Sequence, residues 1–432
     1  MDYSPKVDRP TDDRRHSGVV TPNHFEGTDS ERIQAAVDRA ATTTGVVTIP
    51  AWNASGADRW LIDRAILLPG GITVVLDDCT IQLSDTSRDN FFRSANVGEG
   101  VTEVRWLRDI AILGRGRAVL RGAANPRSTA SGKTLALDPA FDSPLGRGKM
   151  SYGTDAGKDG EKQTGDWRNH GILMAYVDGF LLSDVTIEQA HCWAVTHERV
   201  VNAELTRIRI DSPPEIVVDG VSRYVANRDG INLRHGCKHF RIDDISGETG
   251  DDFIALTSVG LNEEDRRPGR LQDAYMVTTL DYEPGVDDTE DIHISNIRCR
   301  TKNHGVAIRA GDIASIHHVY IDGLTVQGNP DFQSHQTAIL FGGRGYGKPN
   351  VPGSMYEIHA MNLIGTGRSA LVHVEEAIVD CTIVNGIYTG EGEYVVSYHD
   401  LSEHTPKYTT SEGNSGRELV HNVHEVNLVK TR

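Results

Sequence analysis

Three aspartates lie in one short window of the sequence, at a spacing that suits acid–base chemistry. Asp229 precedes Gly230, and the pair Asp251-Asp252 begins 22 residues after Asp229. If the chain advances by one coil over that distance, the three carboxylates lie on one face, because neighbouring strands are roughly 4.8 Å apart. Crowded carboxylates raise one another's pKa, so one can stay protonated as a general acid while another activates water. The window is therefore the candidate catalytic site.

Each part of this window also has a simpler interpretation. Asp-Gly is a common turn pair, and adjacent acids are common on surfaces. Asp251-Asp252 can also be a pair of calcium ligands, although no EF-hand or RTX-type spacing accompanies it. His304, in Asn303-His304-Gly305, begins a run equivalent to the one that follows Asp252, which would place it beside the carboxylates. The joint spacing favours function over structure, and no metal or cofactor is expected.

Short β-rich runs follow one another along most of the chain and share a phrase. An aliphatic-X-aliphatic unit is followed by Asp or Asn and then by another aliphatic residue. The copies are Leu181–Ile187, Phe240–Ile245, Ile292–Ile297 and Val319–Val326. Recurrence at intervals of roughly 20 to 50 residues is typical of repeat architectures. We therefore predict an all-β fold, a right-handed parallel β-helix.

The alternative is a β-sandwich or jelly roll, which also has many short strands. Hairpin signals are scarce, however: Asn385-Gly386 is the only Asn-Gly pair between alternating runs. The Asp-Gly pairs at Asp178, Asp219, Asp229 and Asp322 fall at the ends or insides of repeats, where we do not expect hairpin turns.

The single helical signal and two polar segments define the expected domain organisation. Residues 29–40 have helical periodicity behind Thr28 or Ser30 as a cap, so a short helix should cap the start of the solenoid. We expect an extension over 1–26, one β-helix domain over 27–390, and a tail or last coil over 391–432. Long loops are expected at about 122–168 and 262–289, where the sequence is polar or strongly charged.

Composition limits the classes of partner and compartment. The 432 residues carry a formal net charge of −17, which argues against nucleic acid and anionic membrane surfaces as partners. No apolar run approaches a membrane span, and the amino terminus does not look like a secretory signal, so a cytoplasmic protein is expected unless a signal has been removed. The five scattered cysteines favour reduced, buried thiols. The 44 glycines are expected to turn the chain between strands, and the oligomeric state is left open.

Four motifs allow a comparison with a known family. The sequence resembles the polygalacturonase family of glycoside hydrolases (family 28), whose marks are Asn-X-Asp-Gly, Gly-Asp-Asp, Gly-His-Gly and Arg-Ile-Lys boxes. Residues 227–230 and 250–252 match the first two boxes, and 303–305 match the third with Asn in place of the first Gly. Residues 171–193 and 34–50 also look like the family's coil before the site and its amino-terminal cap. The resemblance covers most of residues 27–390 and implies a β-helix that acts on a carbohydrate.

The resemblance also implies roles for the site residues. Asp251 would protonate the glycosidic oxygen, Asp229 and Asp252 would hold and deprotonate the attacking water, and His304 would orient or tune the acid. The family inverts configuration, which requires room for a water between acid and base. Asn227 is expected to contact substrate.

The fourth box is missing, which changes the expected substrate. One coil after His304, residues 338–343 read Ala-Ile-Leu-Phe-Gly-Gly, where the family has the Arg and Lys that hold a uronate. Arg309, Arg344 and Lys348 are candidates to replace these cations. A short, neutral or partly charged oligosaccharide, cleaved by exo-action, is therefore expected over ordinary polygalacturonate. A polysaccharide lyase, a transglycosylase or epimerase, and a non-catalytic glycan-binding β-helix are the alternatives.

Overall fold

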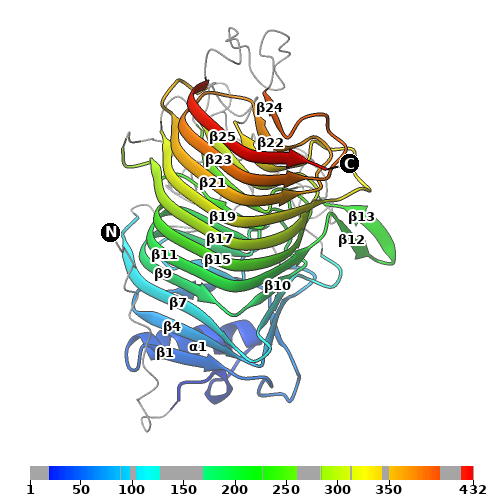
Figure 1. Cartoon of the computed structure of the whole chain (residues 1–432). Coiled ribbons are helices and arrows are strands. Elements are labelled where there is room, and N and C mark those ends of the chain that lie inside the picture. Colours follow the sequence, from blue (N-terminus) through cyan, green and yellow to red (C-terminus); the bar gives the residue numbers. More distant parts are fainter. Residues whose placement is uncertain are drawn as a thin grey trace, which may run out of the picture.

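The computed structural model is a right-handed parallel β-helix, and it confirms the predicted fold class (Figure 1). The structure describes residues 19–87, 89–97, 104–126, 169–225, 227–259, 283, 285–311, 314–342, 350–398 and 420–431. Among these residues, 23 strands form one continuous sheet in which strands pair in parallel with strands of neighbouring coils, on both sides except at the two ends. Parallel pairing across coils excludes the β-sandwich and the jelly roll, whose sheets are antiparallel.

The amino-terminal elements form the cap and the first coils. They are η1 (Pro22–His24), α1 (Asp29–Ala41), β1 (Val46–Ile49), β2 (Trp60–Ile62), β3 (Ile66–Leu68), β4 (Ile72–Asp77), β5 (Thr80–Leu83), β6 (Phe92–Ser94), β7 (Leu107–Arg115) and β8 (Val119–Arg121). Thr28 caps α1 through a capping box, because its hydroxyl accepts the Glu31 N–H while the Glu31 carboxylate accepts the Thr28 N–H. The apolar face of α1, which includes Ile33 and Val37, is fully buried and covers the open end of the solenoid.

The later coils alternate long and short strands. They are β9 (Ile172–Ser183), β10 (Thr186–Glu188), β11 (Val195–Ser212), β12 (Glu215–Val218), β13 (Val221–Tyr224), β14 (Ile231–Leu233), β15 (Lys238–Thr249), β16 (Ile254–Ser258), β17 (Thr289–Thr301), β18 (His304–Ala310), β19 (Ile316–Gly328), β20 (Thr337–Phe341), β21 (Met355–Gly365), β22 (Ala370–Val374), β23 (Ile378–Tyr388), β24 (Val396–Tyr398) and β25 (Val420–Lys430). The long strands stack across the front of the molecule in Figure 1. The short strands β14, β16, β18, β20, β22 and β24 form a second facet.

The core is a set of aliphatic and aromatic rows inside the solenoid. One row runs through Phe240, Ile292, Val319, Ile358 and Cys381, which are in register on successive coils and at most 1% exposed. All five cysteines are buried, as the sequence predicts. Because inward and outward residues alternate, the hydrophobic pattern also fixes the register of every coil.

The bends in the long strands are made by left-handed residues in two columns. One column runs through Asn202, His239, Asp291, His318, Glu357, Asp380 and Asn422, and the second runs through Arg207, Asp244, Asn296, Gly323, Asn362, Asn385 and Asn427. The non-glycine members have φ between 50° and 59°. Asp and Asn, which tolerate this region better than most residues, form most of these corners within the long strands. Left-handed glycines such as Gly71, Gly116 and Gly236 lie between strands, where the sequence predicts them. In three copies of the repeated sequence phrase an Asp or Asn (Asp184, Asp244 or Asn296) is the corner residue, and in the fourth the corner is Gly323.

One hairpin departs from the parallel arrangement. Strands β12 and β13 pair antiparallel and project from the side of the solenoid in Figure 1. Their turn is Asp219-Gly220, with φ of 50° and 79°, the backbone region that two-residue hairpin loops require. The interpretation of this pair as part of a repeat is therefore wrong.

Several expected segments lie partly outside the described residues. These are most of the two long loops, the first 18 residues and residues 399–419. Val20 forms a parallel bridge with Val47, and β24 and β25 pair with β22 and β23, so both ends of the described chain are attached to the solenoid. No described helix is long and apolar enough to cross a membrane.

Candidate active site

Asp229, Asp252 and His304 stand in one column on three successive coils. Each lies two residues before a registered strand position, since Ile231 pairs with Ile254 and Ile254 pairs with Val306. Backbone hydrogen bonds join the coils at this level: the Gly230 N–H donates to the Asp252 carbonyl, and the Phe253 N–H donates to the His304 carbonyl. The structure thus brings together three of the residues that the sequence singles out.

Glycine is required beside this column because the coils approach closely. A Cβ on Gly230 would lie 2.3 Å from the Phe253 carbonyl oxygen, and one on Gly305 would lie 2.3 Å from a Val326 methyl group. Both distances are far below van der Waals contact. The two glycines therefore serve close packing between coils and not a left-handed turn.

Asp251 is a partly buried carboxyl group next to this column. Its Oδ1 accepts hydrogen bonds from the Asn303 side chain and from the Asp252 N–H (3.1 Å). Burial, and next the charge of Asp252, raise the pKa of Asp251 to about 6, although Lys302, Asn303 and Arg309 act in the opposite direction. Asp251 can therefore carry a proton at mildly acidic pH and deliver it.

Asp252 is held differently from its neighbour. The Arg309 guanidinium lies 2.7 Å from Asp252 Oδ2, and both side chains are mostly buried. An ion pair of this kind holds both side chains in a fixed geometry. The other oxygen, Oδ1, is buried and has no hydrogen-bond partner among the residues that the structure describes. A buried carboxylate oxygen without a donor is unusual and is a natural position for a water molecule or a substrate hydroxyl.

His304 is a neutral imidazole. Burial, followed by the charges of Arg309 and His335, holds its pKa well below the usual range. Its Nδ1 lies 2.8 Å from the Thr337 hydroxyl on the next coil. His335 packs edge-to-face on it, and His373 packs on His335 in the same way. These contacts fix the ring, so His304 can orient groups without carrying charge.

Arg228, the second residue of the Asn-X-Asp-Gly box, has a structural role. The Arg228 guanidinium is fully buried and donates to the carbonyls of Ala190, Pro213 and Glu215 and to the Gln189 side chain. It fastens the turn before Asp229 to the preceding coil. Asn227 bends the chain there with φ of 54° and is partly exposed. Its contact with substrate stays a prediction.

The three cations that the sequence suggests for substrate binding differ in where the structure places them. Arg309 is engaged with Asp252, as described above. Arg344 and Lys348 lie outside the described residues. Strand β20 pairs with β18 and places Thr337 opposite His304, so Ala338 and Ile339 do occupy the coil where the Arg-Ile-Lys box is expected.

An aromatic stack on the coils before Asp229 belongs to the same column. The sequence does not predict a functional role for it. His170 and Trp193 stack with ring centroids 4.6 Å apart, and the Arg234 guanidinium lies 5.0 Å from the Trp193 ring. The Ala194 N–H donates to the Asp229 carbonyl, so Trp193 is on the coil next to Asp229. Only the coincidence of a His and a Trp one coil apart could have indicated this stack.

A lysine on the other side of Asp251 was also missed. Lys302 Nζ donates to the Tyr224 hydroxyl (2.6 Å) and lies over the Tyr224 and Phe332 rings. Tyr224 comes from the β12–β13 hairpin, which was not expected, so the cluster was not predictable. Asn303, in contrast, was visible as a departure from the third box, and its side chain contacts Asp251 directly.

Comparisons with known proteins agree on the architecture. No protein-family model matches the chain, and no curated protein sequence matches it. Among solved structures, an exopolygalacturonase from Thermotoga maritima aligns with a TM-score of 0.51 and 15% identity, over 89% of each chain. A mutant tailspike protein of E. coli bacteriophage HK620, in complex with a pentasaccharide, aligns with a TM-score of 0.53 and 13% identity, over 96% of this chain and 67% of that one.

Identities this low establish the fold and leave the chemistry to the site. The alignments cover most of the chain. The chain therefore shares its right-handed parallel β-helix fold with these structures.

Proposed function

We propose that the protein is a glycoside hydrolase that cleaves a glycosidic bond with inversion. One observation carries the proposal: two adjacent aspartates have opposite environments, with the pKa of Asp251 raised to about 6 and Asp252 paired with Arg309. Two neighbouring carboxyl groups in such different environments are the expected acid and base of a glycosidase. The column position of Asp229 adds a second carboxylate beside Asp252.

The mechanism assigns one role to each group. Asp251 gives its proton to the glycosidic oxygen as the bond to the anomeric carbon breaks. Asp252, through the oxygen without a partner, and Asp229 hold a water on the opposite face and take its proton as it attacks. Asn303 orients Asp251, and Arg309 fixes the Asp252 carboxyl group in place. In one turnover Asp251 loses one proton and the base gains one. Proton exchange with solvent then returns both groups to their starting protonation states.

The substrate class follows from what the site lacks. Arg309 is committed to Asp252, and the coil after His304 has Ala338-Ile339 in place of a cation pair. We therefore propose a short neutral or partly charged oligosaccharide, attacked from its end, in preference to plain polygalacturonate. The exopolygalacturonase and the tailspike with its pentasaccharide support a saccharide ligand on this fold.

The test is a turnover screen with defined oligosaccharides. Neutral and uronate-containing substrates are incubated with wild type, Asp251→Asn, and Asp244→Asn as the matched control. Asp244 is an exposed corner residue, so its variant changes an equal charge outside the site. We expect Asp251→Asn to lose on the order of 10²–10⁴-fold in kcat, as removal of a general acid does, and Asp244→Asn to keep full activity.

Other outcomes separate the alternatives. Turnover that persists in Asp251→Asn contradicts its role as the acid. An unsaturated, ultraviolet-absorbing product that disappears with a chelator indicates a lyase. Equal rates on polygalacturonate and on neutral oligosaccharides contradict the proposed substrate preference, and binding without any turnover by wild type indicates a glycan-binding β-helix.

A further inference from the structure

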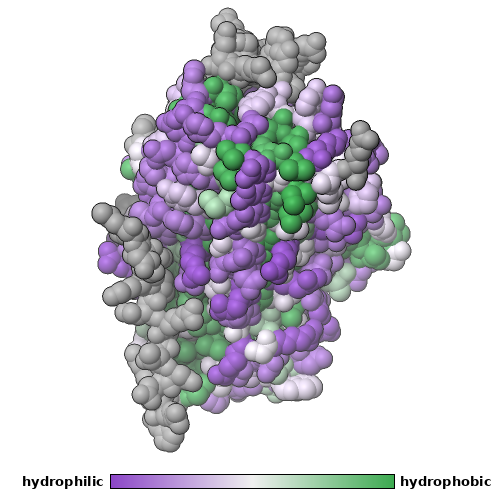
Figure 2. All heavy atoms as spheres, in the orientation of Figure 1, coloured by the Kyte–Doolittle hydropathy of each residue, from purple (hydrophilic) through white to green (hydrophobic). Residues whose placement is uncertain are grey.

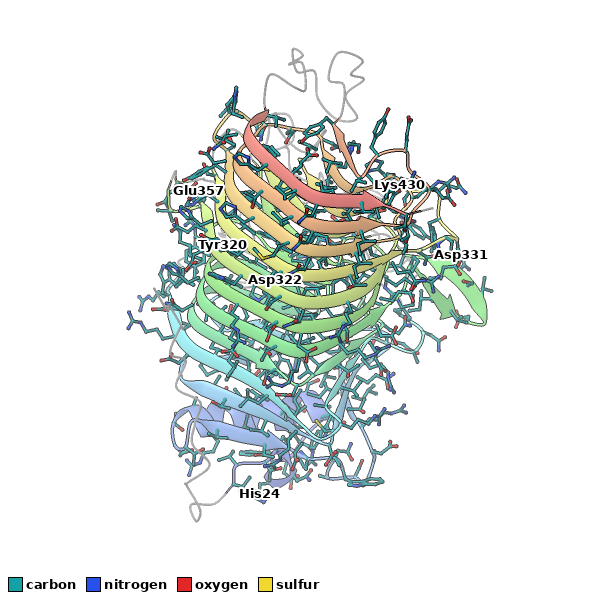
Figure 3. The ribbon with its side chains drawn as sticks, viewed as in Figure 1. His24, Tyr320, Asp322, Asp331, Glu357 and Lys430 are labelled. Carbon is teal, nitrogen blue, oxygen red and sulfur yellow. The ribbon has the colours of Figure 1, made fainter. Side chains whose placement is uncertain are left out.

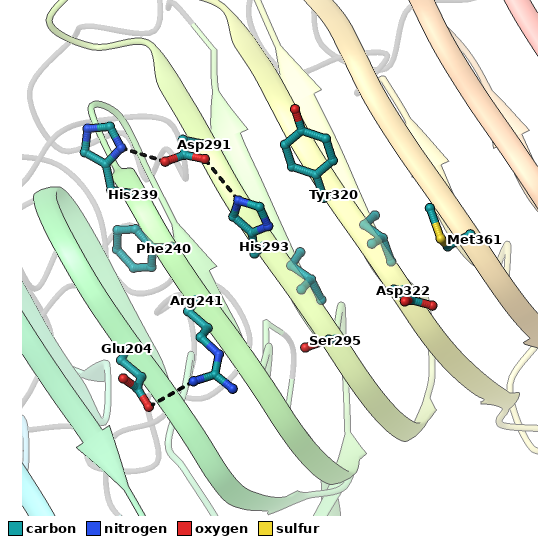
Figure 4. Close-up of a pocket in the computed structure, with 12 residues that line it drawn as sticks. Glu204, His239, Phe240, Arg241, Asp291, His293, Ser295, Tyr320, Asp322 and Met361 are labelled. Atoms are coloured by element: carbon teal, nitrogen blue, oxygen red, sulfur yellow. Dashed lines mark hydrogen bonds and ion pairs between the residues drawn. The ribbon is translucent and has the colours of Figure 1, made fainter. Parts of the chain in front are cut away.

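A groove lies on the outer surface of the long strands, on a facet separate from the aspartate column. It is lined from β11, β15, β17, β19 and β21 and has a volume of about 500 Å³. Figure 3 places Tyr320 and Asp322 on the face shown in Figure 1, and Figure 4 shows the lining side chains. Figure 2 shows that this face is mostly hydrophilic over the middle coils. The volume is in the usual range for small-ligand sites.

The groove arises from the repeat itself. Between the two corner columns, each coil presents two outward side chains. One row runs Glu204, Arg241, His293, Tyr320, and the other runs Asp243, Ser295, Asp322, Met361. Ser295 is the smallest member, so the surface is lowest there, between taller side chains on both sides.

One wall of the groove is a hydrogen-bonded triad. Asp291 Oδ2 is 2.8 Å from His239 Nδ1, and Asp291 Oδ1 is 3.0 Å from His293 Nε2 (Figure 4). Each imidazole therefore donates to the shared carboxylate. In the neutral form, this arrangement leaves Nδ1 of His293 as an acceptor. The triad is held in place by its own bonds.

Tyr320 stands beside the triad with an unused hydroxyl. Its ring is clamped between His293 and His359, with centroid distances of 4.8 and 5.5 Å and nearly parallel planes. Its hydroxyl has no hydrogen-bond partner among the described residues, and the residue is 37% exposed. Stacking along the solenoid axis covers the ring faces, so the groove offers the polar edge of Tyr320 to a ligand.

The charges favour a neutral ligand rich in hydroxyl groups. Arg241 is already occupied by Glu204 at 3.6 Å and by Asp243 at 3.1 Å, and Asp291 and Asp322 leave the groove with a surplus of acid. An anion would be repelled. Hydroxyl groups both donate and accept, so they match carboxylate and imidazole acceptors that lie beside a phenol.

We propose that this groove binds a neutral oligosaccharide, laid along the solenoid axis, as a second and non-catalytic site. The outward residues recur once per coil at roughly 4.8 Å, close to the length of one sugar unit in an extended chain. A periodic ligand can thus meet one polar side chain on each coil. The site goes beyond the proposed hydrolase function, because it would anchor a chain away from the aspartates.

The test is calorimetric titration of the full chain carrying Asp251→Asn, which prevents turnover. The probes are neutral hexasaccharides of xylose, galactose and arabinose, with hexagalacturonate for comparison. We expect at least one neutral hexasaccharide to bind at the groove. Ser295→Trp, which fills the floor, and Tyr320→Ala, which removes the hydroxyl, should each weaken that binding at least tenfold.

The control is His424→Ala, which changes the same outward row on β25, beyond the groove. The affinity of this control for the hexasaccharide should equal that of the Asp251→Asn chain. Melting temperatures verify that all variants fold. Binding that is unchanged by both groove variants, absence of neutral-sugar binding, or a preference for hexagalacturonate would overturn the proposal. The outcome is independent of catalysis: a wild type without hydrolase activity leaves the groove measurement valid.

Discussion

Asp251 and Asp252 are adjacent in the sequence but have different partners. Asp251 is partly buried beside an amide and a like charge, whereas Asp252 faces a guanidinium. The difference depends on Asn303 and Arg309, both on the following coil. Tertiary register, and not local sequence, thus gives the two carboxyl groups their different surroundings.

The raised pKa of Asp251 predicts a pH-dependent change in stability. A folded-state pKa near 6, against a model value of 3.8, means that the folded protein binds this proton more tightly than the unfolded chain. The ionised carboxyl therefore costs stability above pH 6, and the cost disappears as the pH falls through 6 toward 4. Asp251→Asn should raise the free energy of unfolding by roughly 1 to 2 kcal/mol at pH 7.5, after allowance for its partial exposure, and by less at pH 4.

The measurement is urea denaturation at both pH values, with Asp244→Asn as the control. A stabilisation of Asp251→Asn that is the same at pH 4 and pH 7.5 would contradict the raised pKa.

The Asp252–Arg309 pair makes a prediction about stability and about coupling. Arg309→Met leaves a buried carboxylate without its cation, so we expect a loss of about 3 to 5 kcal/mol at neutral pH. Adding Asp252→Asn to that variant removes the stranded charge and should recover most of the loss. A double-mutant cycle by chemical denaturation measures the coupling, and additive effects of the two changes would show that the ion pair does not form.

At the scale of the elements, the corners of the coils are the features that the sequence partly shows. The repeated phrase predicts strands such as Ile292–Ile297 because inward aliphatic residues alternate with polar ones. It does not show that Asn296 bends the strand, since an Asn inside a strand pattern has several meanings. The hairpin at Asp219-Gly220 has a strong turn signal, but it lies within a repeat pattern that predicts parallel strands.

The corner geometry can be tested at Asn385 on β23, which has φ of 57°. Asn385→Gly should change the free energy of unfolding little, because glycine accepts this region readily. Asn385→Val should cost about 1 to 2 kcal/mol, because a β-branched residue is strained there. Thermal and urea denaturation of both variants measures the difference, and equal stability for Val and Gly would contradict a left-handed corner.

Some contacts of the candidate site could be predicted from the sequence, and others could not. Asp251 lies one residue short of a full coil after Asp229, and Asp252 is in register with Asp229, so the proximity of the three carboxyl groups was predictable. The engagement of Arg309 was not, because its partner is set by which residues face outward on adjacent coils. Lys302 and Tyr224 meet only because the unexpected hairpin brings Tyr224 over the coil that carries Asn303.

At the scale of the whole molecule, stability is a sum over stacked coils, each of which contacts its neighbours. Ile294 on β17 lies between β15 and β19 and is 1% exposed, whereas Leu428 on β25 pairs with β23 on one side. We expect Ile294→Ala to cost about 2 to 5 kcal/mol and to speed hydrogen exchange over the central coils.

Leu428→Ala is the matched comparison at the last coil. It should cost less and raise exchange near β25, since few contacts cross that end. Hydrogen–deuterium exchange mass spectrometry resolves the two patterns. An equal rise over the whole chain in both variants would contradict additive stacking.

The central claim is that Asp251 and Asp252 act as acid and base across an attacking water. The most direct measurement is proton NMR of the anomeric signals during the first minutes of wild-type turnover, on whichever oligosaccharide the screen identifies. The account predicts that the first product has the anomeric configuration opposite to that of the bond cleaved, and that Asp251→Asn produces none at a comparable rate. A product that first appears with retained configuration, or as an unsaturated sugar, would contradict it.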